Sequence, residues 1–224
     1  MNVEDLFADL RRKLQSIEDR IRSHPFLDLV EAGRVSRGTL RSFCVQQYYI
    51  ITSDYRSIAY ALHRTADATE RSYLATLLGG EQSALEALAL FGTALGVDAD
   101  QAFESVPLPG AFAYTACVCW LCTYASVPEL AAAFTFNLDA WGANCRRMAE
   151  ALVDQYGFAP EQTAFFWLFA DAATLVESGR TVVQRGLDRG IPAVAFERAA
   201  TLLQAYELMY WDALYADARG GENS

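Results

Sequence analysis

The chain has 224 residues, of which 53% are hydrophobic, and its formal net charge at pH 7 is −10. A chain of this length is expected to form one or at most two domains with a sizeable core. The acidic balance and the scattered basic residues exclude the positive stripe that binds nucleic acid or an anionic membrane surface.

The start of the chain predicts where the protein resides. The sequence MNVEDLFADLRRKL is acidic and amphipathic, which is the wrong order for a secretory signal, and no apolar run is long enough to span a bilayer. Five cysteines are an odd number, which suits reduced, mostly buried thiols better than disulfides. We therefore expect a cytoplasmic protein.

Apolar residues recur at spacings of three and four along the first third of the chain. This pattern predicts an amphipathic helix over residues 2–23, followed by a short helix that ends at Gly33. Ser36 or Thr39 can cap a long helix that runs to about Thr65.

The same pattern continues to the C-terminus. Residues 68–96 are predicted to be helical, with an interruption or kink at Gly79 and Gly80, and PLPG at 107–110 is predicted to be a loop. Further helices are predicted over 111–126, 128–155, 160–189 and 192–218. We expect an all-α, single-domain bundle of seven or eight helices over residues 1–218, with a frayed tail at 219–224.

Carboxylates among core residues are the first candidates for a site. Glu207 shares a helix stripe with Leu203 and Leu214, where no helix start offers it another use. A buried carboxylate must be hydrogen-bonded, paired or protonated, so we expect Glu207 to face a pocket. Glu81 lies on a stripe of leucines and is open to two interpretations, as a buried acid or as a first-turn acid of a helix restarting after the glycines.

Other polar side chains point to the same space. Asn137 and Trp141 share a stripe of large apolar residues, and Tyr114 and Tyr210 bring phenols. Gln47 is either part of this pocket or an interhelical hydrogen-bonding residue. Polar groups converging from several helices favour a small-molecule pocket. Asp54 is open to two interpretations, as a pocket carboxylate or as a surface partner of an arginine, and the second is slightly favoured.

Three motifs carry a resemblance. HPF, then a glycine, then L..F..QQYY occur within residues 24–50, and AYT at 113–115 and YELMYWD at 206–212 follow in order. With these motifs the chain resembles the TenA and PqqC superfamily, all-helical proteins with the heme-oxygenase-like fold. Members of this superfamily form dimers or tetramers, so the resemblance implies a homodimer or higher homo-oligomer.

The resemblance also assigns residues. TenA enzymes of the thiaminase II type act on thiamin-related pyrimidines with a cysteine nucleophile, a glutamate acid/base and an aspartate that grips the pyrimidine. The resemblance places this glutamate at Glu207 and a tyrosine of the family's motif at Tyr114. It places Asn137 at the position of the nucleophile and Gln47 at that of the aspartate. Because an amide cannot form the covalent intermediate, the ordinary thiaminase reaction is not expected.

The chain departs from the patterns of two other branches of the superfamily. Di-iron oxidases have a Glu followed seven residues later by His, but Leu88 stands seven residues after Glu81. The two histidines, His24 and His63, lie at helix ends, and the cysteines of CVCWLC at 117–122 point in different directions, so we expect no metal and no cofactor. PqqC-type cofactorless oxidases have a basic pocket, of which this chain keeps only the tyrosines.

These observations predict a metal-independent, enzyme-like protein that binds a neutral aromatic or heterocyclic small molecule. Glu207 is the predicted acid or base. The predicted ligand-binding residues are Gln47, Glu81, Tyr114, Asn137, Trp141 and Tyr210. If the protein is an enzyme, the resemblance implies a TenA-like hydrolase or lyase, or a PqqC-like oxidase. A non-catalytic binding or regulatory protein is the main alternative, and a di-iron oxidase is the other.

Overall fold

The computed structural model describes residues 1–220, apart from the side chains at positions 101 and 103. Seven helices have 16 residues or more: α1 (Val3–Arg22), α3 (Arg37–Arg64), α4 (Ala68–Leu95), α6 (Pro109–Tyr124), α7 (Val127–Tyr156), α9 (Ala173–Asp188) and α10 (Ala193–Gly220). Shorter elements are α2 (Pro25–Glu31), α5 (Ala99–Glu104), the 3₁₀ helix η1 (Pro160–Thr163) and α8 (Ala164–Ala170). No strand occurs in the described range, so the predicted all-α class is confirmed.

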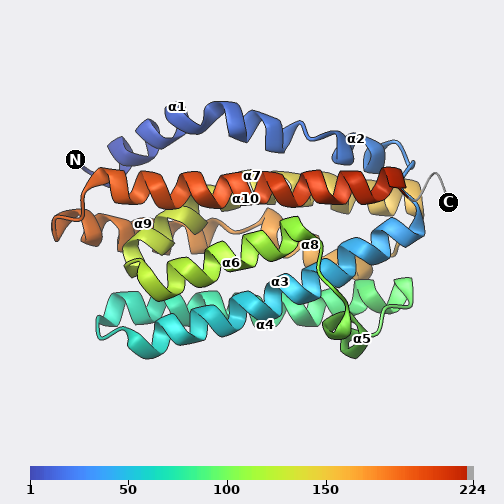
Figure 1. The fold of residues 1–224 in the computed structure, drawn as a ribbon, viewed down its shortest axis with the longest axis horizontal. Coiled ribbons are helices and arrows are strands. Elements are labelled where there is room, and N and C mark those ends of the chain that lie inside the picture. The colour runs from blue at the N-terminus through green and yellow to red at the C-terminus, as the bar shows by residue number, and fades with distance from the viewer. Residues whose placement is uncertain (221–224) are drawn as a thin grey trace.

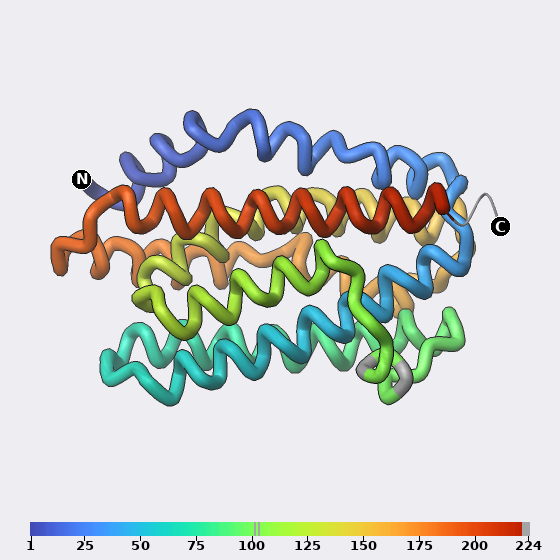
Figure 2. Tube along the Cα trace, in the orientation of Figure 1, coloured from blue at the N-terminus to red at the C-terminus, as the bar shows by residue number. Residues whose placement is uncertain are grey.

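The long helices lie along one axis of the molecule (Figure 1). In this view α1 and α2 form the upper layer, α10 crosses the centre in front of α7, and α3 and α4 form the lower layer. Figure 2 shows α3 and α4 running side by side in opposite directions. None of the described helices combines the length and the apolar character that crossing a membrane requires.

Side-chain caps fix several of the predicted helix starts. Ser36 Oγ accepts a hydrogen bond from the Thr39 backbone N–H at 3.0 Å, so Ser36 is the cap of α3. His24 Nδ1 accepts from the Phe26 backbone N–H at 3.2 Å, so His24 is the N-terminal cap of α2. Gly157 ends α7 in the left-handed conformation, with φ of 69°.

The predicted interruption at Gly79 and Gly80 is wrong, because α4 runs through both glycines without a break. Each glycine in a helix interior costs about 1 kcal/mol. Buried side chains on both sides of the pair, such as Leu74 and Leu88, anchor the two halves to the core and outweigh that cost. Glu81 is therefore not a first-turn acid.

The single helix predicted over 160–189 is also wrong, since the structure has η1, α8 and α9 with a break at residues 171–172. Phe166 of α8 packs in one core cluster and Val183 of α9 in the other. The break allows each of these helices to turn its apolar face toward its own cluster. The backbone approaches closely here, because a Cβ on Gly142 would lie 2.6 Å from the Phe169 carbonyl oxygen.

Three smaller boundaries differ from the prediction. The loop at 107–110 is shorter, because Pro109 already lies in the first turn of α6, where its fixed φ and missing N–H suit a helix start. The helix α5 was not predicted. The last helix continues through Gly220, so the tail predicted at 219–224 is partly helical, and its residues 221–224 lie outside the described range.

Candidate functional site

A cavity of about 360 Å³ opens between seven of the helices. Its lining includes Ile50 and Ala84 from one core cluster and Leu77 and Phe134 from the other, so it lies where the two clusters meet. Its walls come from α3, α4, α6, α7, α10 and the segment where α8 ends and α9 begins. A volume of this size accommodates a small organic molecule.

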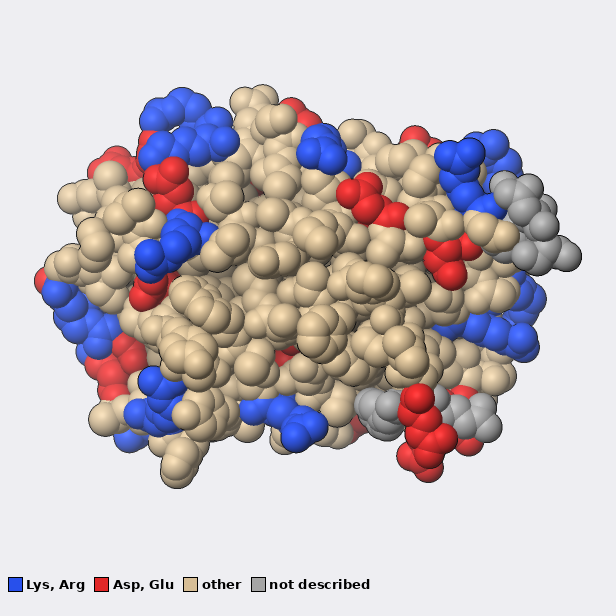
Figure 3. Space-filling view, viewed as in Figure 1, with Lys and Arg blue, Asp and Glu red and all other residues tan. Residues whose placement is uncertain are grey.

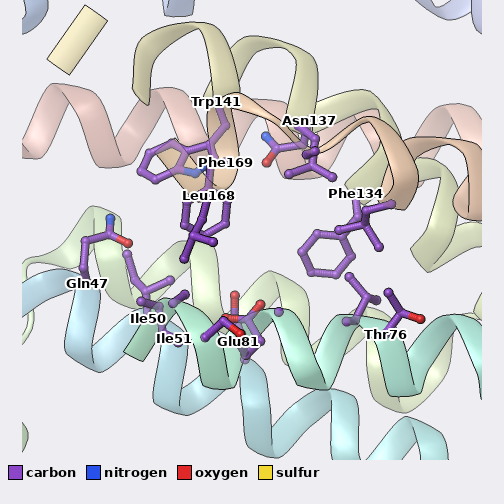
Figure 4. A pocket seen from close by; sticks show the side chains of 18 of the residues that line it. Gln47, Ile50, Ile51, Thr76, Glu81, Phe134, Asn137, Trp141, Leu168 and Phe169 are labelled. Atoms are coloured by element: carbon purple, nitrogen blue, oxygen red, sulfur yellow. The ribbon is translucent and has the colours of Figure 1, made fainter. Parts of the chain in front are cut away.

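The structure brings the seven predicted site residues together around this cavity. The lining includes Gln47, Glu81, Tyr114, Asn137, Trp141, Glu207 and Tyr210. Figure 4 shows Glu81 projecting from one side of the cavity, with Asn137 and Trp141 on the opposite side and Gln47 at one end. Their roles toward a ligand remain predictions.

Glu207 is the most deeply buried acid of the site, with 1% of its side chain exposed. Its two carboxylate oxygens accept hydrogen bonds from different helices. Trp211 Nε1 donates to Oε1 at 3.0 Å, and Asn137 Nδ2 donates to Oε2. Burial raises the pKa of Glu207 from 4.5 to about 7, against the opposing effect of these two donors. Glu207 can therefore exchange a proton near neutral pH.

Asn137 connects this carboxylate to two further groups. Its Nδ2 also donates to Gln204 Oε1 at 2.8 Å, and its Oδ1 accepts from the Tyr114 hydroxyl at 3.4 Å. Both amide hydrogens and the carbonyl are thus engaged. This arrangement orients Asn137 and links Tyr114 on α6 to Glu207 on α10 through α7.

The opposite end of the site is built around Gln47. Its Nε2 donates to the Tyr210 hydroxyl at 2.8 Å, so the interhelical hydrogen bond considered from the sequence is present, and Gln47 also lines the cavity. The Trp141 ring packs against Tyr210 and against Phe169, with ring centroids 6.4 and 5.8 Å apart. These rings form an apolar, aromatic wall.

The surface position favoured for Asp54 is wrong. Only 3% of Asp54 is exposed, and it lines the cavity. Its Oδ1 is buried and has no hydrogen-bond partner among the described residues. Arg64, one of the expected partners, instead donates to the backbone carbonyl oxygens of Cys122 and Thr123. Asp54 lies one heptad after Gln47, on the same inward face of α3, and that spacing was the available signal.

Sequence reasoning missed the wall formed by the α8–α9 break. Leu168, Phe169 and Asp171 line the cavity there. A continuous helix over 160–189 would have carried these residues along one cylinder, so the wall appears only once the break is known. The aromatic run AFFWLFA, which precedes a small-residue stretch, was the only local sign of a change in packing.

A family model for the TENA/THI-4/PQQC family matches residues 11–216. The chain belongs to this family. Among solved structures, a TenA homologue from P. horikoshii OT3 is 16% identical, with a TM-score of 0.78 over 96% of this chain and 99% of that chain. A TenA homologue from Pyrococcus furiosus is 18% identical, with a TM-score of 0.74 over 94% and 100%.

A domain of unknown function with a heme oxygenase-like fold, from Shewanella denitrificans OS217, is 13% identical. Its TM-score is 0.78, over 96% of this chain and 93% of that chain. No curated protein matches the sequence. At these identities the likeness shows the fold, and the predicted heme-oxygenase-like architecture is confirmed.

Within this family the thiols of the chain offer no nucleophile to the cavity. Cysteine is absent from the described residues that line it. Cys145, two turns after Asn137 on α7, is fully buried outside the lining, and burial raises its pKa well above the ordinary value. An inert buried thiol is a poor nucleophile.

The donor set does not fit the di-iron centre of the family's oxidase branch. In the described part of the chain no group of three His, Cys, Asp or Glu side chains is placed to hold a metal ion. Leu88, at the position of the histidine ligand, is buried in the core. Imidazole ligands are characteristic of such sites, and the described lining of this cavity contains no histidine.

Proposed function

We propose that this TENA/THI-4/PQQC family member is a metal-independent protein that binds a small aromatic or heterocyclic molecule in the cavity, with Glu207 as general acid or base. The single observation that carries the proposal is Glu207 itself. It is a buried carboxyl group at the cavity wall, held by Asn137 and Trp211, with its pKa raised to about 7. A group whose pKa lies near the working pH is well suited to acid–base catalysis.

The cavity supports the proposed ligand class. Most of its lining is apolar, and Trp141, Phe134 and Phe169 offer ring faces and edges to a planar body. The few polar groups, such as Tyr114 and Gln47, come from different helices and can fix its orientation by hydrogen bonding. A basic residue is absent from the described lining, which disfavours phosphorylated or multiply acidic ligands.

A non-catalytic binding protein is the second candidate, and Asn137 favours it. The resemblance places Asn137 at the position of a nucleophilic cysteine, and its amide is fully engaged in hydrogen bonds. Such a cavity can retain a ligand without forming a covalent intermediate.

One experiment separates the two candidates. The full chain is incubated with thiamin-related pyrimidines and related amines, and the mixture is assayed for conversion and for binding, in parallel with Glu207→Gln. Turnover that the substitution abolishes supports the enzyme. Binding of a probe without turnover by either protein supports the binding protein. Failure of every probe to bind counts against both.

We also propose that the protein is a homo-oligomer that associates through the outer face of α6. Phe112, Trp120 and Tyr124 are exposed there at helical spacing, Met209 of α10 is exposed beside them, and α6 carries no charged residue. Figure 3 shows the charged side chains mostly around the edge of this face. An uncharged patch lets two copies, each with a net charge of −10, meet with few like charges between them.

A further inference from the structure

The Asp54 carboxylate lines the cavity from α3, the helix that also carries Gln47. It is almost completely buried, and its Oδ1 has no hydrogen-bond partner within the described chain. Burying a carboxylate without a donor is costly, so this oxygen must either hold a proton or receive a donor from a bound molecule.

Glu81 brings a second carboxyl group to the same side. It projects into the cavity (Figure 4) from α4, the helix packed antiparallel to α3. Glu81 and Asp54 both line the cavity. Burial raises the pKa of Asp54 well above its ordinary value, and the neighbouring charge of Glu81 raises it further. Burial raises the pKa of Glu81 to about 8. Asp54, whose Oδ1 has no donor within the described chain, therefore holds a proton in the absence of a ligand, and Glu81, with a pKa of about 8, is mainly protonated at pH 7 as well.

Among the described residues, no basic side chain lines the cavity, and none is among the groups that shift the pKa of Asp54 or of Glu81. The titratable groups that interact with Asp54 from the packed helices are neutral or acidic. They are Glu81 of α4 and Tyr114, Cys117, Cys119 and Cys122 of α6. The charge of Glu207 on α10 interacts with Tyr114 in turn. Arg64 is bound to backbone carbonyl oxygens of α6. The acid pair therefore lacks a cation that the fold itself could have provided.

We propose that Asp54 and Glu81 form a subsite for a positively charged nitrogen, so that the ligand of this cavity is a protonated amine or amidine attached to an aromatic or other apolar body. This inference rests on the proposed ligand-binding function of the cavity. The N–H groups of the cation donate to Asp54 Oδ1 and to Glu81. The body lies toward Trp141 and Phe169, which Figure 4 shows across the cavity from Glu81.

Binding of such a cation changes the protonation of the pair. The ligand brings one positive charge into a site whose two carboxyl groups are protonated, one of these groups releases its proton to the solvent, and the resulting single carboxylate balances the charge of the ligand. A neutral ligand of the same shape would leave this proton in place. Cation binding is therefore coupled to proton release, whereas binding of a neutral analogue is not.

Calorimetric titration of the full chain tests the subsite. The probes are 2-phenylethylammonium and benzylammonium, their neutral alcohol analogues, and magnesium chloride. We expect each ammonium to bind about ten- to a hundred-fold more tightly than its alcohol, because hydrogen bonds to charged groups are worth about 1.5–3 kcal/mol. Titrations at pH 7 in two buffers of different ionisation enthalpy should show release of up to about one proton with the ammonium probes only.

Four variants test which carboxyl groups are responsible for the preference for the ammonium probe. Asp54→Asn and Glu81→Gln should each reduce the preference for the ammonium probe, Asp54→Asn to near parity with the alcohol and without proton release. Glu86→Gln, an exposed acid on α4 outside the lining, is the matched control and should bind as the wild type does. Glu207→Gln should keep the preference, which separates this subsite from the proposed acid or base.

Equal affinity for ammonium and alcohol, or an unchanged preference in Asp54→Asn, overturns the inference while the proposed function stands. Tighter binding of magnesium than of either ammonium also overturns it, in favour of a cation site for a metal. If none of the organic probes binds, this ligand class is wrong. Circular dichroism of Asp54→Asn establishes that it is folded, and we expect its stability to equal or exceed that of the wild type because an unpaired buried carboxyl group is removed.

Discussion

Asn137 and Glu207 are joined by a hydrogen bond across the cavity wall, from Asn137 Nδ2 on α7 to Glu207 Oε2 on α10. This contact combines the two features that set the chemistry of the site. The hydrogen bond lowers the pKa of Glu207, which burial raises. Asn137 stands at the position that the resemblance assigns to a nucleophile, and its amide only donates and accepts hydrogen bonds.

Removing the Asn137 amide should therefore affect both stability and the acid. In Asn137→Leu, Glu207 keeps the Trp211 donor but loses Asn137, and Gln204 Oε1 also loses its Asn137 donor, so we expect the pKa of Glu207 to rise and the free energy of unfolding to fall by about 1–3 kcal/mol. Urea denaturation and NMR titration measure the two effects. Asn144→Leu is the control, because Asn144 is buried on the same helix but donates to the Ile21 carbonyl oxygen. It should cost comparable stability without moving the Glu207 pKa. A similar pKa shift in both variants would contradict a direct role of Asn137.

The raised pKa of Glu207 also makes stability depend on pH. The folded state binds a proton more tightly than the unfolded state does, so stability should fall as the pH rises from about 4.5 to 7. The shift corresponds to a loss on the order of 3 kcal/mol. Glu81, whose folded pKa is about 8, should extend the decline toward that pH. Urea unfolding between pH 5 and 8.5 checks this trend. Glu207→Gln should flatten it, whereas the exposed-site change Glu86→Gln should leave it intact, and parallel curves for wild type and Glu207→Gln would refute the assignment.

Gly79, which lines the cavity, and Gly142, which lies against the end of α8, should respond in opposite directions to alanine. A Cβ at Gly142 would lie 2.6 Å from the Phe169 carbonyl oxygen, so Gly142→Ala should push the end of α8 away and destabilise the fold by about 1–3 kcal/mol. A Cβ at Gly79 would have no neighbour within 4 Å, so Gly79→Ala should stabilise α4 by about 0.5–1 kcal/mol. Thermal and urea unfolding measure both. Equal effects at the two sites would show that the α7–α8 approach is not close.

The proposed association through α6 predicts a change of oligomeric state. Substituting Trp120 and Tyr124 together by Asp places four like charges in a symmetric dimer contact, which should dissociate the oligomer without unfolding the subunit. Light scattering coupled to gel filtration measures the mass. Glu86→Gln is expected to retain the wild-type mass. An oligomer that survives the double substitution would place the interface elsewhere, and a wild-type monomer would refute homo-oligomerisation.

Much of the architecture was predictable because caps and apolar periodicity act locally. Ser36 caps α3 as its sequence indicates, and the polar residues that share apolar stripes, from Gln47 to Tyr210, do meet around one cavity. The predictions that were wrong depend on packing between helices, which the local sequence does not show. Gly79 and Gly80 stay helical because the flanking turns are anchored in the core.

Asp54 shows why a site residue can escape prediction. Its sequence neighbours offered arginines as partners, but Arg64 reaches backbone carbonyls on another helix, and the choice between surface and cavity depended on that packing. Likewise, the break near Asp171 follows from two core clusters competing for one segment. A single sequence does not reveal such competition.

The ionisation of Glu207 tests the proposed acid or base most directly. Carbon-13 NMR of the full chain with side-chain-labelled glutamate, assigned by comparison with Glu207→Gln, follows this carboxyl group through a pH titration. We expect one glutamate signal with a midpoint near 7 that is missing from Glu207→Gln. A Glu207 midpoint near its ordinary value of 4.5 would contradict its role as the proton-exchanging group of the cavity.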